Sequence, residues 1–154
     1  MPVPVPVPEE RRFQLVGGKG ERHRATRRSR TARSAVPIGL DHERLDVYRL
    51  ALDFVVFANG IVEALPRGRS HLADQFTRAS TSIVLTIAEG AGKRSKGDKR
   101  RYYLTARGSA TESAALLDVC WRLELLDEAG QKAGKSMLVR VVAMLIKLAQ
   151  ACEV

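Results

Sequence analysis

Aromatic residues, cysteine and long apolar runs are all scarce in this sequence. Aromatic side chains make up only 5% of the 154 residues, while Leu, Ala and Val are abundant, which favours helices over strands. The two cysteines, Cys120 and Cys152, lack metal-ligand spacing, so we expect them to behave as small hydrophobes rather than as a disulfide. No apolar run approaches the roughly 18 residues that a membrane span requires. The first residues lack the apolar segment of a secretory signal, so we expect a cytoplasmic protein with no membrane partner.

Signatures of catalysis and of cofactor binding are also missing from the sequence. The three histidines, His23, His42 and His71, have no Cys, His or carboxylate at ligand spacing, which argues against a metal site. No phosphate-binding loop, dinucleotide fingerprint or nucleophile elbow occurs. A carboxylate dyad of Glu89 and Glu112 is disfavoured, because the cations around them favour ion pairs instead. We therefore expect a protein that is not an enzyme and that uses no cofactor and no metal.

Positive charge is what the sequence has in excess. It contains 26 Lys and Arg against 17 Asp and Glu, a formal net charge of +9, which points to polyanionic partners. Residues 1–40 hold nine of the basic residues and three of the acidic ones, so this quarter carries +6. It alternates Pro with Val, then becomes Gly- and Arg-rich, and it has too few apolar residues to form a core. We predict a disordered Pro/Arg-rich tail, either a basic arm that contacts phosphates or a dispensable extension from an over-long gene start.

Apolar residues recur at helical spacing in four segments of the remaining chain. Asp41 is a plausible N-cap of the first helix, and Ser95 with Asp98 three residues later begins the third. Gly90 and Gly92 predict a left-handed end of the second helix. Because Gly and Pro separate the segments by short loops, residues 41–154 are predicted to form an all-α, antiparallel up-down-up-down four-helix bundle. The predicted helices span residues 43–64, 72–89, 96–126 and 128–151.

Three further expectations concern packing. Gly108 lies inside the third helix, where glycine costs about 1 kcal/mol relative to alanine, so it predicts a close helix crossing. Glu89 lies at a helix end that disfavours acids, so either Arg78 or Arg107 is its partner or it faces solvent. The first and fourth helices carry apolar residues around more than one face, which indicates either a wide core face or an added subunit interface.

A basic patch spans the second loop and the start of the third helix. Between residues 93 and 107 seven basic residues face one acid, Asp98, which gives a local charge of +6. Phosphate contacts through such a patch are salt-dependent and show weak sequence preference. Tyr102 and Tyr103 point about 100° apart, so one is predicted to be buried, while Tyr102 either stacks on a base or packs on the surface. The candidate nucleic-acid-binding residues are Lys93, Arg94, Lys96, Lys99, Arg100, Arg101 and Arg107.

Two runs, RASTSIVLTIAEGAGKRS and RRYYLTARGSATE, carry a family resemblance. They resemble the small four-helix-bundle proteins encoded by intervening sequences in bacterial 23S rRNA genes, whose fold is shared by the accessory variability determinant proteins of diversity-generating retroelements. With the run Leu45-Asp46-Val47-Tyr48 upstream, the resemblance covers residues 43 to about 150. The motif residues that carry it, expected to be structural, include Arg78, Ser82, Glu89, Gly90, Gly108, Ser109 and Glu112.

The resemblance implies a function class as well as a fold. Proteins of this family form closed rings, typically homopentamers, with a basic surface, and RNA is favoured over DNA on the resemblance alone. In the retroelement branch a reverse transcriptase is a further partner. Our hypothesis is a non-catalytic nucleic-acid-binding assembly protein that acts as a ring-shaped homo-oligomer. The alternatives are a protein-interaction module whose basic face binds an acidic protein without nucleic-acid affinity, and a structural bundle whose charge only solubilises it.

Overall fold

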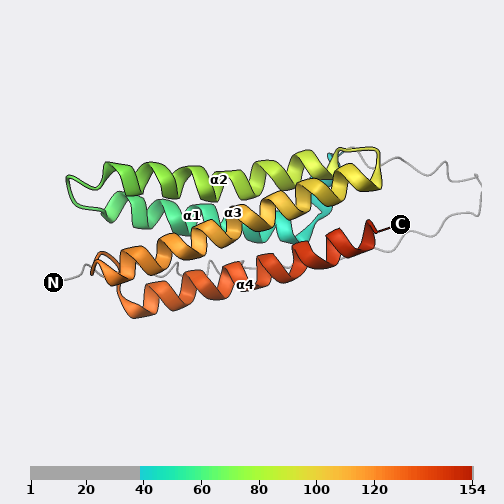
Figure 1. Cartoon of the computed structure of the whole chain (residues 1–154). Coiled ribbons are helices and arrows are strands. Elements are labelled where there is room, and N and C mark those ends of the chain that lie inside the picture. Colours follow the sequence, from blue (N-terminus) through green and yellow to red (C-terminus); the bar gives the residue numbers. More distant parts are fainter. Residues whose placement is uncertain (1–38, 154) are drawn as a thin grey trace, which may run out of the picture. The chain divides into compact units, whose positions relative to one another are not determined.

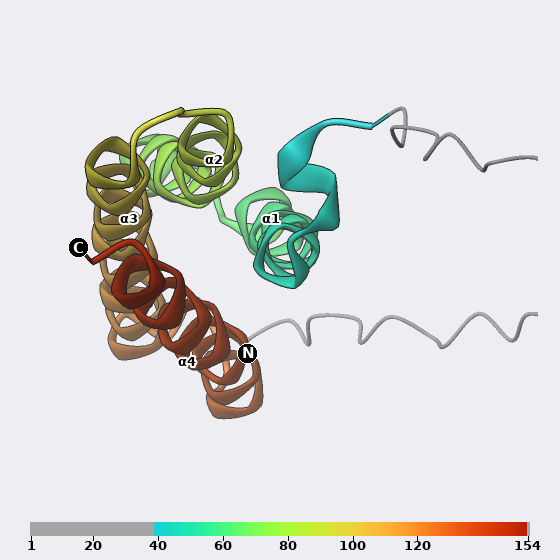
Figure 2. The same ribbon diagram turned by 90° about the vertical axis from the view of Figure 1, so that its right-hand side faces the viewer.

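The computed structural model describes residues 39–153. This part of the chain forms a short 3-10 helix, η1 (Asp41–Arg44), followed by α1 (Asp46–Ala64), α2 (Ser70–Ala91), α3 (Lys96–Arg122) and α4 (Glu128–Ala151). Successive helices run antiparallel and pack in chain order, and α4 returns to contact α1 (Figures 1 and 2). The predicted all-α four-helix bundle is therefore confirmed. The predicted tail falls outside the described residues except for its last two, and its boundary near residue 41 stays a prediction.

The core consists of the apolar stripes that the periodicity indicates. Phe54 of α1 and Phe76 of α2 are fully buried, with their ring centroids 6.5 Å apart. In α1, the positions that repeat at spacings of three and four are buried from Val47 to Ile61, namely Val47, Ala51, Phe54, Ala58 and Ile61, whereas Leu65 at the end of the stripe is half-buried. Within residues 39–153, none of the helices has the length and apolarity that a membrane crossing requires.

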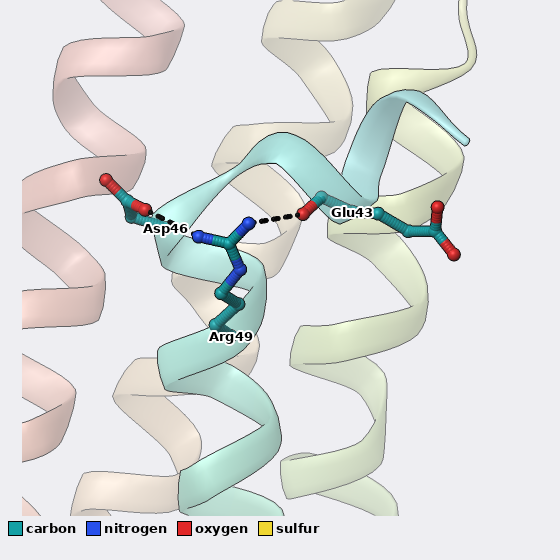
Figure 3. A network of polar contacts seen from close by, with 3 residues as sticks. All are labelled: Glu43, Asp46 and Arg49. Carbon is teal, nitrogen blue, oxygen red and sulfur yellow. Dashed lines mark hydrogen bonds and ion pairs between the residues drawn. The ribbon is translucent and has the colours of Figure 1, made fainter. Parts of the chain in front are cut away.

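The chain enters α1 through a break that the sequence pattern does not reveal. Asp41 is not the N-cap of this helix, because it begins η1, and the backbone is extended at Leu45 (φ −86°, ψ 122°) before α1 starts at Asp46. Arg49 spans the break: its guanidinium lies 3.2 Å from the Asp46 carboxylate and donates to the Glu43 carbonyl oxygen at 3.1 Å (Figure 3). The predicted helix from residue 43 therefore begins three residues too early.

The second helix ends differently from the prediction. No left-handed cap occurs at Gly90 or Gly92, because α2 continues through Gly90 to Ala91 and Gly92 is right-handed (φ −78°). Gly90 is buried where α2 meets α3: a Cβ built on it would lie 2.8 Å from Cβ of Tyr102. Gly108, by contrast, is exposed, and a Cβ there would meet no atom within 4 Å. No close crossing therefore occurs at Gly108 within the described bundle, and Gly90 is the glycine that the crossing of α2 and α3 requires.

The boundaries of α3 combine one confirmed prediction with one correction. The Ser95 hydroxyl oxygen accepts from the Asp98 N–H at 3.0 Å, which confirms this N-cap. The helix ends at Arg122 rather than Leu126, because Glu124 adopts a left-handed φ of 57° and the Leu125 N–H donates to the Cys120 carbonyl at 2.8 Å. This turn allows Leu126 to be buried against the end of the core.

Candidate nucleic-acid interface

The structure gathers most of the basic patch at one end of the bundle. Residues 92–95 connect α2 to α3, and the first two turns of α3 follow directly, so six of the seven predicted cations lie close along this segment (Figure 1). Arg107 lies two turns further along α3 and is separate from them. Five are exposed, and Lys93 and Lys99 are half-buried. The structure therefore brings together Lys93, Arg94, Lys96, Lys99, Arg100 and Arg101 at the α2–α3 end.

Three of these cations are engaged within the bundle. Lys93 pairs with Glu89 at 3.3 Å, and Arg100 pairs with Glu153 beyond the end of α4 at 3.3 Å. Lys99 donates to the carbonyl oxygen of Ala91 at 3.0 Å, which satisfies an acceptor left open at the C-terminus of α2. These contacts hold the loop against the helix ends, so the three side chains are less available to a ligand.

The charged groups of the other basic residues in the patch form no ion pair within the described residues. The side chains of Arg94, Lys96 and Arg107 make no hydrogen bond or ion pair with another residue between 39 and 153. Arg101 lies over the ring of Tyr102, with the guanidinium carbon 5.7 Å from the ring centroid, and its charge also acts on Glu89. Because these four side chains form no ion pair that a phosphate would have to displace, they are the stronger candidates for contact with a polyanion.

Glu89 and Tyr102 both contact Lys93, one of the basic residues of the patch. A hydrogen bond from Tyr102 and then the contact with Lys93 lower the pKa of Glu89. Neither Arg78 nor Arg107 is its partner, so both predicted partners are wrong. The reason is that α2 continues beyond Gly90, which places Lys93 one turn after Glu89.

The two adjacent tyrosines have different environments. Tyr103 is buried and Tyr102 is half-buried, as the helical spacing predicts. The Lys93 ammonium lies 4.6 Å from the centroid of the Tyr102 ring, so this ring already packs against a cation within the bundle. Of the two roles considered for Tyr102, surface packing is the one that these contacts favour.

The charge of the bundle is unevenly distributed. Residues 41–154 contain 17 basic and 14 acidic residues, a net charge of +3. Residues 93–107 contribute seven basic residues and one acid, so the remainder has ten basic against thirteen acidic residues, a net charge of −3. Positive charge is therefore concentrated in residues 93–107 of the sequence, whereas the rest of residues 41–154 is slightly acidic.

Four of the seven motif residues, Arg78, Ser82, Ser109 and Glu112, lie together where α2 packs against α3. Ser82 and Ser109 are hydrogen-bonded through their hydroxyl groups at 2.9 Å, which joins the two helices. Arg78, Ser82 and Glu112 line an open groove of about 370 Å³ together with Gln75 and Ala79. Sequence reasoning missed this groove, because only antiparallel packing brings residues 34 positions apart to the same level.

Other candidate chemistry is not assembled. Among residues 39–153, no group of three or more His, Cys, Asp or Glu side chains is placed to hold a metal ion. Cys120 is buried and Cys152 is half-buried, both as free thiols, and burial raises the pKa of the Cys120 thiol. Neither cysteine forms a disulfide within the described residues.

The fold and the site define a small α-helical bundle protein with a cationic end and a polar motif between its second and third helices. A family model described as 23S rRNA-intervening sequence protein matches residues 43–147. The match covers most of the chain and includes both the basic patch and the motif, so the protein belongs to this family. No curated protein matches the chain.

Proposed function

We propose that this protein is a non-catalytic nucleic-acid-binding assembly protein that uses the basic end of its bundle and favours RNA. The observation that carries the proposal is the group of exposed cations that form no ion pair within the described residues, Arg94, Lys96 and Arg101, in the segment that holds the excess positive charge of residues 41–154. The family description, which refers to intervening sequences of 23S rRNA, supports RNA as the first ligand to test. Binding would be largely electrostatic, because no base-reading signature accompanies the cations.

We further propose that the protein acts as a ring-shaped homo-oligomer, with five copies favoured by the family resemblance. Apolar side chains remain exposed on the first and last helices: Val56 of α1 is 70% exposed and Val139 of α4 is 68% exposed. A ring formed by one repeated contact covers two different faces of each subunit, which suits apolar residues on separate helices. It would also repeat the basic patch once per copy. In the retroelement branch of the family, the same ring would bind a reverse transcriptase.

The first test is a titration of labelled RNA and DNA at several salt concentrations. We expect the triple variant Arg94→Gln, Lys96→Gln and Arg101→Gln to bind more weakly than the unaltered chain. If each side chain neutralises one phosphate, the slope of log affinity against log salt falls by about two to three. RNA and DNA are compared as single strands of equal length, so that only the sugar differs.

A matched control removes the same charge at the opposite end of the bundle. The variant Arg67→Gln, Arg69→Gln and Arg122→Gln has the same net charge as the triple patch variant, and its three residues lie near the α1–α2 and α3–α4 connections. It should retain the affinity and the salt slope of the unaltered chain. Equal losses in both variants would show that net charge, rather than the basic end, determines binding.

The basic tail requires a separate comparison. If the bundle holds the site, a shortened chain that begins at Asp41 should bind RNA with the same affinity as the full chain. The slope of log affinity against log salt should also be the same. Loss of binding with the tail would make residues 1–40 the functional part and the bundle a scaffold. No binding by either chain would refute the proposal and leave an acidic protein partner as the alternative.

A further inference from the structure

Two opposite charges on the outer face of α2 and α3 have no partner in the bundle. Arg78 and Glu112 line the same groove, and both are exposed. Neither side chain makes an ion pair or a hydrogen bond with any residue of the described chain, and the two do not pair with each other. The hydrogen bond between Ser82 and Ser109 joins the helices beside them, so both charges project from fixed backbone.

Two features of the surface around Arg78 and Glu112 would allow another helix to approach closely. Gly108 lies one turn before Glu112, inside a helix, where glycine costs about 1 kcal/mol relative to alanine. Nothing within the described bundle requires it, because a Cβ there would meet no atom within 4 Å. Leu85, two turns after Arg78 on the same side of α2, is 67% exposed. A bare helix backbone and an uncovered Leu are features that a neighbouring helix would explain.

We propose that this face docks onto a second copy of the chain, with Arg78 of one copy paired to Glu112 of the next. The inference rests on the proposed assembly and names one contact between its copies. The charge pattern favours a second copy as the occupant of this face. The groove carries one unpaired charge of each sign, so a second copy supplies the opposite charge for each. An Arg–carboxylate pair between two rigid helices also fixes their register, which a purely apolar contact does not.

The same pair determines how the copies are oriented. If the two copies were related by a two-fold axis perpendicular to the helices, at the level of the groove, Arg78 would face Arg78 and Glu112 would face Glu112. Both contacts would be repulsive. An axis along the helices instead brings α2 of one copy against α3 of the next, so unlike charges meet. In that arrangement every α2–α3 loop lies at the same end of the assembly. The basic patches then form one continuous cationic surface, as the proposed function requires.

The test is a charge exchange in the full chain, with the mass of the assembly measured by light scattering over a range of protomer concentrations. Arg78→Glu and Glu112→Arg should each raise the concentration needed for half-assembly by at least tenfold. The double variant, which restores the pair with its charges reversed, should assemble like the unaltered chain. Gly108→Leu should also weaken assembly, because its side chain occupies the space that the second copy would fill. Helical circular dichroism checks that each variant is folded, which we expect at these exposed sites.

The outcomes separate this inference from the proposed function. If the unaltered chain stays monomeric at every concentration, the proposed ring fails and this contact fails with it. If the chain assembles but neither single exchange changes the mass, the ring stands and this contact is wrong. Weak assembly of both single variants without rescue in the double variant would also overturn the pairing of Arg78 with Glu112.

Discussion

Replacement of Gly90 by alanine tests the packing of α2 against α3. The added Cβ would lie 2.8 Å from Cβ of Tyr102 and 3.2 Å from Cε1 of Tyr103, both on α3. Cβ of Tyr102 is fixed to the α3 backbone, so the helices themselves must move apart. Overpacking of this kind costs about 1–3 kcal/mol, and the gain in helix propensity offsets about 1 kcal/mol of it. We expect a net loss of up to about 2 kcal/mol in the free energy of unfolding.

The assay is urea denaturation followed by circular dichroism, at one protomer concentration for all variants. Gly60→Ala is the matched control, because Gly60 lies inside α1 and a Cβ there would meet nothing within 4 Å. This control should gain up to about 1 kcal/mol from helix propensity alone. If Gly90→Ala is as stable as Gly60→Ala, the close crossing at Gly90 does not constrain the bundle and the reasoning is refuted.

Three other predictions concern polar contacts. Ser95→Ala removes the N-cap of α3 and should cost about 1 kcal/mol in urea denaturation. Lys99→Met removes the hydrogen bond to the end of α2, so it should reduce stability by up to about 1 kcal/mol and reduce RNA affinity less than Arg94→Gln does. Hydrogen bonds from Lys135 and then Gln131 lower the pKa of Asp118. Its stabilisation is therefore complete above the unfolded pKa of about 4 and is lost as the pH falls through the lower folded value, so Asp118→Asn should be less stable at pH 7, by an amount that shrinks as the pH is lowered below 4.

Each of these predictions has an outcome that contradicts it. An unchanged midpoint for Ser95→Ala would mean that the cap adds nothing to the stability of α3. A larger loss of RNA affinity for Lys99→Met than for Arg94→Gln would make the engaged cation the true phosphate contact. A stability difference between Asp118→Asn and the unaltered chain that stays constant from pH 7 to pH 2 would show that the carboxylate charge is irrelevant.

Local features of the structure were predictable from the sequence. The α1 stripe from Val47 to Ile61 is buried because apolar spacing of three and four places its members on one side of a helix, whatever the helix packs against. The N-cap at Ser95 was predictable for the same reason, since donor and acceptor are three residues apart. The family resemblance also came from local runs, and the family model over residues 43–147 confirms it.

Contacts between helices were not predictable in this way. The sequence shows two glycines in comparable helical settings, yet Gly90 is packed against α3 and Gly108 has open space, because the level at which α2 crosses α3 depends on the whole bundle. Glu89 pairs with Lys93 only because α2 continues past Gly90, a boundary that local propensity places too early.

The sequence by itself therefore determined the number of helices, their approximate limits and the concentration of charge in residues 93–107, since each depends on neighbours within a few positions. Tertiary structure alone decided which cations are free, which glycine is packed, and that Arg78 and Glu112 share a groove. Those features depend on the register of antiparallel helices. That register is set by side-chain packing along their full length rather than by any local run of residues.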